Sequence, residues 1–403
     1  MAVKVSKPEL NLREKISELD KPSGVAGEAM LRADTPQEQF NLIGAGRRNL
    51  IINGDMQVAQ RSTSVSVTGS AFTYETIDRI KIGRTGTDQL VVTASQATDA
   101  PDGFTYSHKL DVTTAESVID AGEYYRGVQY YIEGQDLAGL AYGTNSAKHI
   151  TISFWVKSSK TGTYAVGIFH DESTDRTYPA SYSVDESGVW EYKSIVIEGD
   201  TASAITADNT GRLAIIWYLM AGSTYTGGSL TGWGNYSAAG DLAKDHNVAW
   251  GTSTDDYWQI TGIQMELGKV ATPFEHRSYG EELALCQRYF EKIEYDTSTD
   301  SGGGAAAETL IANGFAYTTT RSLNHIKFNV IKRSQPTVTI VGGVAKMEVL
   351  DTTGGWITTT AFTARANIHG TRLDLTHPSS LTAGRALEVR ILSGGYLNID
   401  AEI

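Results

Sequence analysis

The sequence predicts a mainly β protein: an antiparallel, jelly-roll-like β-sandwich, a smaller C-terminal β-domain, and a short helical N-terminal segment. The 403 residues include 41 Gly and 20 Tyr but only 8 Pro, which suits many turns and half-solvated strands. Short β-rich runs follow one another from residue 49 to about residue 274, with no helical period between them. This order favours antiparallel sheets over a parallel α/β sheet.

The N-terminal segment, residues 1–48, differs from the rest because it is charged and helical in pattern. Leu12, Ile16 and Leu19 fall on one helical face, and Thr35 is a suitable N-cap for a second short helix. So short an apolar stripe cannot bury itself. We therefore expect this segment to anchor the chain to its own copies or to another protein, the alternative being a frayed arm.

The predicted sandwich spans residues 49–275. In residues 149–159, HITISFWVKSS, apolar and polar side chains alternate as in a strand with one buried face. Similar runs are TYAVGIF (163–169), WEYKSIVIEG (190–199), RLAIIWYLM (212–220) and DYWQITGIQMEL (256–267). Trp155, Trp217 and Trp258 lie inside these apolar runs, so we predict that all three belong to the core.

Residues 276–403 are predicted to form a capped helix followed by the smaller β-domain. Ser278 is the expected N-cap and Glu281 its capping-box partner. The expected apolar face of the helix consists of Tyr279, Leu283, Cys286 and Phe290. Cys286 is therefore interpreted as a small core residue rather than a reactive thiol. A glycine-rich stretch around residues 302–304 is typical of a loop before the last strands.

Composition lowers the expectation of several function classes. A formal net charge of −13 repels phosphate backbones, so no nucleic-acid partner is expected. A single cysteine excludes an internal disulfide and a cysteine-based zinc site. Neither a signal peptide nor a run of about 18 apolar residues is present, so we expect synthesis in a cytoplasm without membrane insertion. The sequence contains no P-loop, nucleophile elbow or zinc-protease motif, and no cofactor or metal is expected.

The long insertion at residues 221–253 is the candidate binding segment. Recognition of a sugar requires exposed aromatic rings that stack on its C–H face, with polar groups nearby for the hydroxyls. The insertion supplies both, and the candidate carbohydrate-binding residues are Tyr225, Trp233, Asn235, Tyr236 and Trp250. Alternatively, these aromatic rings pack the insertion onto the sandwich or fill an interface between subunits.

Two further groups of residues are weaker candidates. One is the cluster Tyr124, Tyr125, Tyr130 and Tyr131, which strand alternation would split between a core face and a solvated face. The other is the set of acidic turns, such as Asp171, Glu172 and Asp175, which could hold calcium or could simply be solvated. We favour the structural interpretation for both.

Three segments resemble a known family. Residues 18–61, 150–164 and 258–292 are similar to phage tail-fibre and virion structural proteins from phages of marine and other aquatic bacteria. The third is the most specific, since it joins a strand, a Pro-Phe-Glu-His-Arg motif and a capped helix. The resemblance implies a jelly-roll domain like a carbohydrate-binding module and a location in the virion. It also implies contact with host-surface glycan, homotrimers, and attachment to other phage tail or capsid proteins, which we assign to residues 1–48.

Three hypotheses for function follow. The first is a tail-fibre-type adhesin that attaches the phage to its host and is not an enzyme. The second is a structural connector of the tail, baseplate or capsid that binds no ligand. The third is a polysaccharide depolymerase, which is disfavoured because no carboxylate pair is singled out by spacing and no repeat indicates a β-helix. A trimer would also hide exposed strand edges.

Overall fold

A computed structural model describes residues 47–86, 89–172, 174–294, 309–351, 355–378 and 381–403. The predicted helical anchor within residues 1–48 lies outside this part of the chain, apart from Arg47 and Arg48. The glycine-rich stretch around residues 302–304 lies outside it as well.

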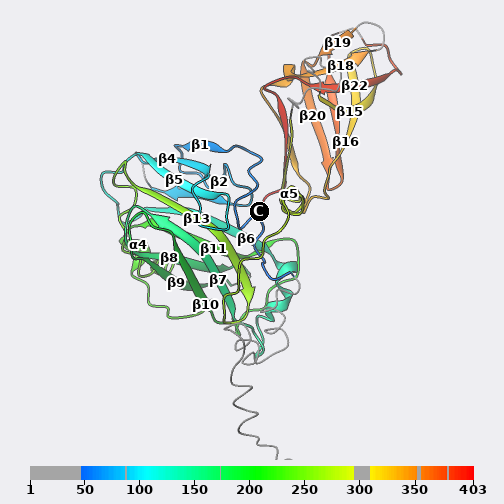
Figure 1. Ribbon diagram of the computed structural model, residues 1–403. Helices are drawn as coiled ribbons and strands as arrows, with labels where there is room; N and C mark the ends of the chain where they lie inside the picture. Colours follow the sequence, from blue (N-terminus) through cyan, green and yellow to red (C-terminus); the bar gives the residue numbers. More distant parts are fainter. Residues whose placement is uncertain (1–46, 87–88, 173, 295–308, 352–354, 379–380) are drawn as a thin grey trace, which may run out of the picture.

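The larger part of the fold is an antiparallel β-sandwich, as predicted (Figure 1). Sheet A consists, in spatial order, of β1 (Ser64–Val67), β4 (Val91–Ala97), β5 (Ser107–Thr114), β13 (Tyr257–Leu267), β7 (Ile150–Ser158) and β10 (Glu191–Ile197). Sheet B consists of β12 (Gly234–Asn235), β9 (Arg176–Val184), β8 (Gly162–His170), β11 (Gly211–Ala221), β6 (Tyr124–Glu133), β3 (Lys81–Thr85) and β2 (Thr73–Tyr74). Successive strands β5, β6, β7 and β8 alternate between the sheets, which is the jelly-roll-like feature.

Aromatic side chains from both sheets meet in the core between them. Phe154 on sheet A and Trp217 on sheet B are edge to face, with ring centroids 5.5 Å apart. The indole N–H of Trp258 donates to the hydroxyl of Tyr182 across the sandwich at 3.1 Å. Trp217 and Trp258 are fully buried, as predicted. Trp155 is not: it lies only half-buried on the opposite face of β7, because side chains alternate along a strand and Phe154 occupies the inward position.

The insertion between β11 and β13 folds back over the outer face of sheet B. It contains the short helix α4 (Ser223–Thr226), the 3₁₀ turn η2 (Ala239–Asp241) and strand β12. Under it, a small apolar cluster includes Tyr124 and Tyr218 from sheet B and Ala243 from the insertion. The part of the outer face of sheet B around Tyr124 and Tyr218 is therefore covered by the chain itself.

Helix α5 (Tyr279–Gln287) follows the sandwich and begins at the predicted residue. The hydroxyl of Ser278 accepts a hydrogen bond from the backbone N–H of Glu281 at 3.4 Å. The Glu281 carboxylate does not complete a capping box in this arrangement, since it pairs with Arg47 at 2.6 Å.

The predicted apolar face of α5 is wrong for two of its four residues. The helix ends before Phe290, which instead begins strand β14, and Tyr279 is 55% exposed. The buried positions of the helix are Glu282 and Cys286. Glu282 tolerates burial because its carboxylate accepts from the backbone N–H of Asn53 at 2.5 Å. Burial also raises the pKa of the Cys286 thiol, which fits a core residue.

The C-terminal part forms a second, smaller β-domain with its own core (Figure 1). Sheet C consists of β14 (Phe290–Glu294), β23 (Tyr396–Asp400) and β17 (Thr337–Val341). Sheet D consists of β19 (Gly355–Thr358), β18 (Met347–Asp351), β22 (Ala386–Ile391), β15 (Thr309–Ala316), β16 (Arg321–Lys327), β21 (Gly370–Thr376) and β20 (Ala361–Asn367). Two 3₁₀ segments, η1 (Gly134–Leu140) and η3 (Val344–Lys346), complete the described elements.

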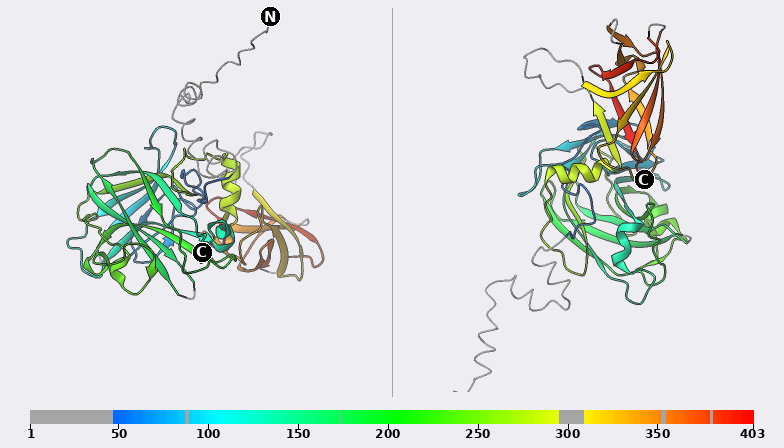
Figure 2. Two further views of the ribbon diagram at one scale, coloured as in Figure 1. Left: turned by 90° about the horizontal axis from the view of Figure 1, so that it is seen from below. Right: turned by 90° about the vertical axis from the view of Figure 1, so that its right-hand side faces the viewer.

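The C-terminal residues return to the sandwich and join the two parts, and both views of Figure 2 place the end of the chain there. The guanidinium of Arg79 pairs with the Glu402 carboxylate and lies 3.5 Å from the centroid of the Tyr289 ring. Beside it, the Arg61 guanidinium lies 3.7 Å from the centroid of Phe290. Cationic groups of the sandwich therefore meet both the carboxylate and the aromatic rings of the C-terminal part.

Candidate functional site

The structure places the predicted aromatic residues of the insertion in different environments. Trp250 is fully buried and packs on Tyr125, with ring centroids 5.3 Å apart. The end of the insertion re-enters the core there, where the carboxylate of Asp256 accepts from the backbone N–H of Gly251 at 3.0 Å. The prediction that Trp250 contacts a sugar is therefore corrected, since its ring offers no free face.

Trp233 and Tyr225 are partly buried and packed edge to face against sheet B. The indole N–H of Trp233 donates to the backbone carbonyl of Glu198 at 2.6 Å, and its ring centroid lies 5.6 Å from that of Tyr178. The ring of Tyr225 lies 4.7 Å from that of Tyr124 at 86°. Both side chains hold the insertion onto the sheet.

Tyr236 and Asn235 are the most exposed of the predicted set. Tyr236 is 38% exposed, but its ring packs edge to face against Phe169 at 5.6 Å. The side-chain oxygen of Asn235 accepts from the guanidinium of Arg176 at 2.7 Å. These contacts favour the alternative that the aromatic residues of the insertion pack it onto the sandwich.

The tyrosine cluster on β6 is divided between two faces, as predicted, but the second face, which carries Tyr124, lies under the insertion and is not solvated. Tyr125 and Tyr130 are buried in the core between the sheets. Tyr124 and Tyr131 belong to the cluster under the insertion instead. Tyr125 and Tyr130 are an odd number of residues apart, so strict alternation would put them on opposite faces. A register shift between β6 and β11 near Trp217 brings both onto the core face.

The outer face of sheet A, in contrast, carries an aromatic groove of about 540 Å³. Its aromatic side chains are Phe104, Trp155, Tyr192, Phe274 and His276. Its polar side chains are Asp102, Ser153 and Thr272. None of these residues was among the predicted site residues. The alternation in residues 149–159 was the available signal, because it assigns Trp155 to the face opposite Phe154.

Trp155 and Tyr192 form one side of the groove. They are directly opposite each other on the neighbouring strands β7 and β10. Their ring centroids are 5.4 Å apart with the planes at 57°, and Tyr192 is 46% exposed. A cross-strand pair on an outward face keeps both rings in place while leaving them accessible.

Phe104, Phe274 and His276 form the other side. Phe104 follows a tight turn in which its backbone N–H donates to the carbonyl of Pro101 at 3.1 Å. Gly103 takes the positive φ of +92° that this turn requires. The ring centroid of Phe104 lies 5.1 Å from that of Phe274 and 5.3 Å from that of His276. The three rings support one another edge to face or tilted.

The segment 272–276 is held in place by buried polar contacts. The side chain of Gln264 donates to the carbonyl of Thr272 at 3.2 Å and accepts from the backbone N–H of Glu275 at 2.8 Å. The carboxylate of Glu275 accepts from the backbone N–H of Arg48 at 2.5 Å. The Pro-Phe-Glu-His-Arg motif singled out in the sequence therefore builds one side of the groove.

A bulge in β13 forms the floor. The register between β13 and β7 shifts between Thr261 and Gln264, and Gly262 within the bulge has φ +63°. A Cβ atom at this position would lie 2.7 Å from Cζ of Phe104 and 3.3 Å from Cδ1 of Trp155. Only glycine leaves the groove open here, and bulges of this kind often shape binding sites.

A charged polar cluster lies on the same sheet. The Asp99 carboxylate accepts from Lys157 at 2.8 Å, Gln259 at 3.1 Å and the indole N–H of Trp190 at 3.2 Å. Partial burial tends to raise the pKa of Asp99, but these three donors hold it below its ordinary value. Lys157 is two residues beyond Trp155, so the cluster extends the groove with hydrogen-bonding groups.

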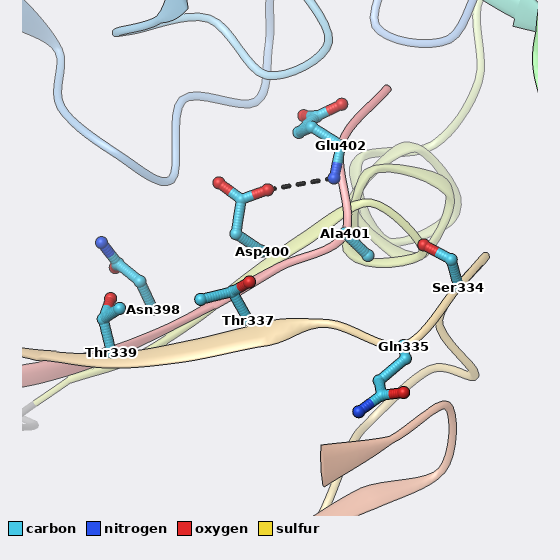
Figure 3. Close-up of a pocket in the computed structure, with 8 residues that line it drawn as sticks. All are labelled: Ser334, Gln335, Thr337, Thr339, Asn398, Asp400, Ala401 and Glu402. Atoms are coloured by element: carbon cyan, nitrogen blue, oxygen red, sulfur yellow. Dashed lines mark hydrogen bonds between the residues drawn. The ribbon is translucent and has the colours of Figure 1, made fainter. Parts of the chain in front are cut away.

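A second hollow, of about 460 Å³, lies beside sheet C and is polar (Figure 3). Thr337, Thr339 and Asn398 come from the neighbouring strands β17 and β23. The carboxylate of Asp400 accepts from the backbone N–H of Glu402 at 3.0 Å. Within the part of the chain that the structure describes, no aromatic ring lines this hollow, so those residues offer no surface on which a sugar ring could stack.

The acidic turns do not come together as a metal site within the described ranges. No group of three or more His, Cys, Asp or Glu side chains with suitable geometry is found there. Glu172 instead accepts from the backbone N–H of Thr206 at 2.7 Å and pairs with Arg212 at 3.6 Å. None of the helices in the described part of the chain is long and apolar enough to cross a membrane.

The solved structures that match part of this chain are distant from it in sequence and in structure. The enzymatically active domain of tailspike protein 4 from bacteriophage CBA120 is 13% identical with a TM-score of 0.29, and the match covers 55% of this chain but 21% of that one. The family 11 carbohydrate-binding module from Clostridium thermocellum, in complex with a mixed-linked tetrasaccharide, is 12% identical with a TM-score of 0.24 and coverages of 54% and 95%. The xylan-binding domain CBM22-1 from Paenibacillus barcinonensis Xyn10C is 9% identical with a TM-score of 0.25 and coverages of 56% and 100%. No family model and no curated protein matches the sequence.

Proposed function

We propose that this protein binds a glycan in the aromatic groove on sheet A. The observation that carries the proposal is the open pair of Trp155 and Tyr192 facing the rings of Phe104 and Phe274. An aromatic face removes the apolar C–H face of a sugar from water, and nearby polar groups bind its hydroxyls. The exposed carboxylate of Asp102 supplies such a group, and Lys157 and Asp99 supply others beside the groove.

The groove is suited to binding rather than to cleavage. Glycoside hydrolysis ordinarily uses two carboxyl groups on opposite sides of the scissile bond. Among the described residues that line the groove, Asp102 is the sole carboxylate. We therefore propose a lectin-like module rather than a polysaccharide depolymerase.

In its biological setting, we propose a tail-fibre-type adhesin of a phage virion that attaches to a host-surface glycan. The resemblance of residues 18–61, 150–164 and 258–292 to tail-fibre proteins supports this, and the third segment contributes Phe274 and His276 to the groove. A homotrimer, attached to the virion through residues 1–48, would present three grooves. Several weak sites per particle then suffice through avidity.

The test is calorimetric titration of the purified chain with a panel of neutral hexasaccharides and with extracted host polysaccharide. Trp155→Ala and Tyr192→Ala should each weaken the binding of whichever saccharide the wild-type protein binds. Tyr236→Ala is the matched control, because it removes a similarly exposed tyrosine from the insertion. Binding that survives both groove variants, or no binding by any form, would overturn the proposal and favour the structural connector.

A further inference from the structure

The exposed face of sheet D carries a row of cationic side chains. His325 on β16, Arg372 on β21 and Arg365 on β20 are directly opposite one another in register. Lys327 is in the next row of the same face, and Arg321 lies further along β16. The chain as a whole has a net charge of −13, so this concentration of positive charge runs against its composition.

A pocket of about 330 Å³ lies at one end of this row. Its side chains include Lys327, Arg372, His325, His369 and Asn367. No carboxylate is among the described residues that line it. Asn367 shapes its rim, because the side-chain oxygen accepts from the backbone N–H groups of His369 and Gly370 at 2.8 and 3.2 Å.

One carboxylate of the chain, that of Asp374, already pairs with the arginine side chains on this face. A single oxygen of Asp374 lies 3.2 Å from Arg372, 3.5 Å from Arg321 and 3.5 Å from Arg365. Asp374 is buried, whereas Arg321 and Arg365 are exposed. Three guanidinium groups therefore share one negative charge, and within the described part of the chain no second carboxylate pairs with any of them.

Aromatic side chains accompany the cations. Phe315 on β15 is 43% exposed and shares its row with Asp374 through the register of β15, β16 and β21. Tyr317 is 57% exposed, and the Arg321 guanidinium lies 5.7 Å from its ring centroid. Glu388 on β22 lies in the same row as His325, two strands away across β15. Its negative charge marks the edge of the cationic area on that side.

We infer that this surface, defined by Arg321, Lys327, Arg365, Arg372 and their pocket, is a second binding site that takes a carboxylate-bearing glycan. Guanidinium groups bind carboxylates through two parallel hydrogen bonds. The exposed rings of Phe315 and Tyr317 can contact the sugar rings that carry these carboxylates. The positive charge of these side chains complements the negative charge of the glycan's carboxylates. The acidic remainder of the chain opposes a nucleic-acid duplex, which carries one negative charge about every 1.7 Å along its axis.

This site is independent of the groove on sheet A, because it draws its residues from another sheet and recognises charge. The experiment uses the full chain with hexagalacturonate as the probe, its methyl ester as the uncharged control, and single-stranded DNA as a second polyanion. The test variant is Lys327→Gln with Arg365→Gln, two exposed side chains whose loss should leave the fold intact. The charge-matched control is Lys148→Gln with Lys269→Gln, two exposed lysines of the sandwich.

The expected result is binding of hexagalacturonate that weakens with salt, and a loss of about tenfold in the test variant from two exposed charge contacts. The control variant and the Trp155→Ala groove variant should retain wild-type affinity. Equal losses in the test and control variants would overturn the inference, because the effect would then be one of net charge. Equal affinity for the methyl ester, or equally tight binding of DNA, would overturn the assignment to acidic glycan.

Discussion

The ring centroids of Trp155 and Tyr192 lie 5.4 Å apart on neighbouring strands, and the ring planes are inclined at 57°. The two rings therefore touch without covering each other's outward faces. Each ring holds its neighbour in position and can contact a ligand itself. Their contributions to binding should therefore be coupled.

The first prediction is a double-mutant cycle on this pair. Covering a ring face of roughly 80 Å² is worth about 2 kcal/mol, so Trp155→Ala should weaken glycan binding about thirtyfold. Tyr192→Ala should cost about half as much free energy. The double variant should lose less than the sum by about 0.5 kcal/mol or more, because residues in contact are not additive. Strict additivity in calorimetric titrations would show that the rings act separately.

The second prediction concerns Trp250. This side chain is fully buried against Tyr125, so Trp250→Ala should lower the free energy of unfolding by about 3–5 kcal/mol through a core cavity. Tyr236→Ala, in the same insertion but exposed, should cost less than about 1 kcal/mol. Urea unfolding followed by tryptophan fluorescence measures both. Similar losses for the two variants would contradict the placement of Trp250 in the core.

The third prediction concerns the junction between the sandwich and the C-terminal part. Glu402→Leu leaves the buried Arg79 guanidinium without its carboxylate, which should cost about 3–5 kcal/mol. The double variant Arg79→Met with Glu402→Leu removes both charges and should recover most of that loss. Differential scanning calorimetry should show the C-terminal transition separating from that of the sandwich in the single variant. An unchanged thermogram would mean that the ion pair does not couple the two parts.

The fourth prediction is a pH dependence that originates at His246. Its ring accepts from the backbone N–H of Ala165 at 3.3 Å and contacts the carbonyl of Val248 at 3.0 Å. Burial lowers the pKa of His246 from 6.5 to about 4, against the hydrogen bond with Val248. The unfolded chain therefore binds more protons between these values. Stability that is present above pH 6.5 should decline as the pH falls toward 4, by up to about 3 kcal/mol from this group.

His246→Gln isolates this contribution, because an amide can replace both hydrogen bonds without titrating. The variant should lose less stability than the wild-type protein between pH 7 and pH 4.5 in urea titrations. Burial raises the pKa of Asp78 to about 7, against the charge of Arg61, so Asp78 contributes with the opposite sign. It is present in both proteins and cancels in the comparison. Parallel pH profiles would exclude His246 as the origin.

Much of the architecture could be predicted because it depends on local patterns. Alternation along the strand runs gives each strand a buried face, which is why Trp217 and Trp258 were correctly assigned to the core. Ser278 caps α5 because a short hydroxyl side chain bonds the backbone three residues on, whatever surrounds it. The prediction that Trp155 belongs to the core is wrong, because side chains alternate along β7 and this apolar run is not buried on both faces.

The proposed binding surface could not be predicted in the same way. The aromatic content of the insertion indicated a site, but its rings found apolar partners such as Tyr124 and Phe169 on the outer face of sheet B. Those partners come from strands far apart in the sequence, so no local pattern reveals them.

The sequence by itself determined which segments become strands and where α5 begins, and its aromatic and polar content is the basis for the proposed glycan binding. Only the tertiary structure decided which aromatic rings stay accessible. The groove joins residues 102–104, Trp155, Tyr192, Gly262 and residues 271–276, which meet through strand pairing and one bulge. A ring's exposure depends on what packs against it, and this is set by contacts between distant segments rather than by its neighbours in the chain.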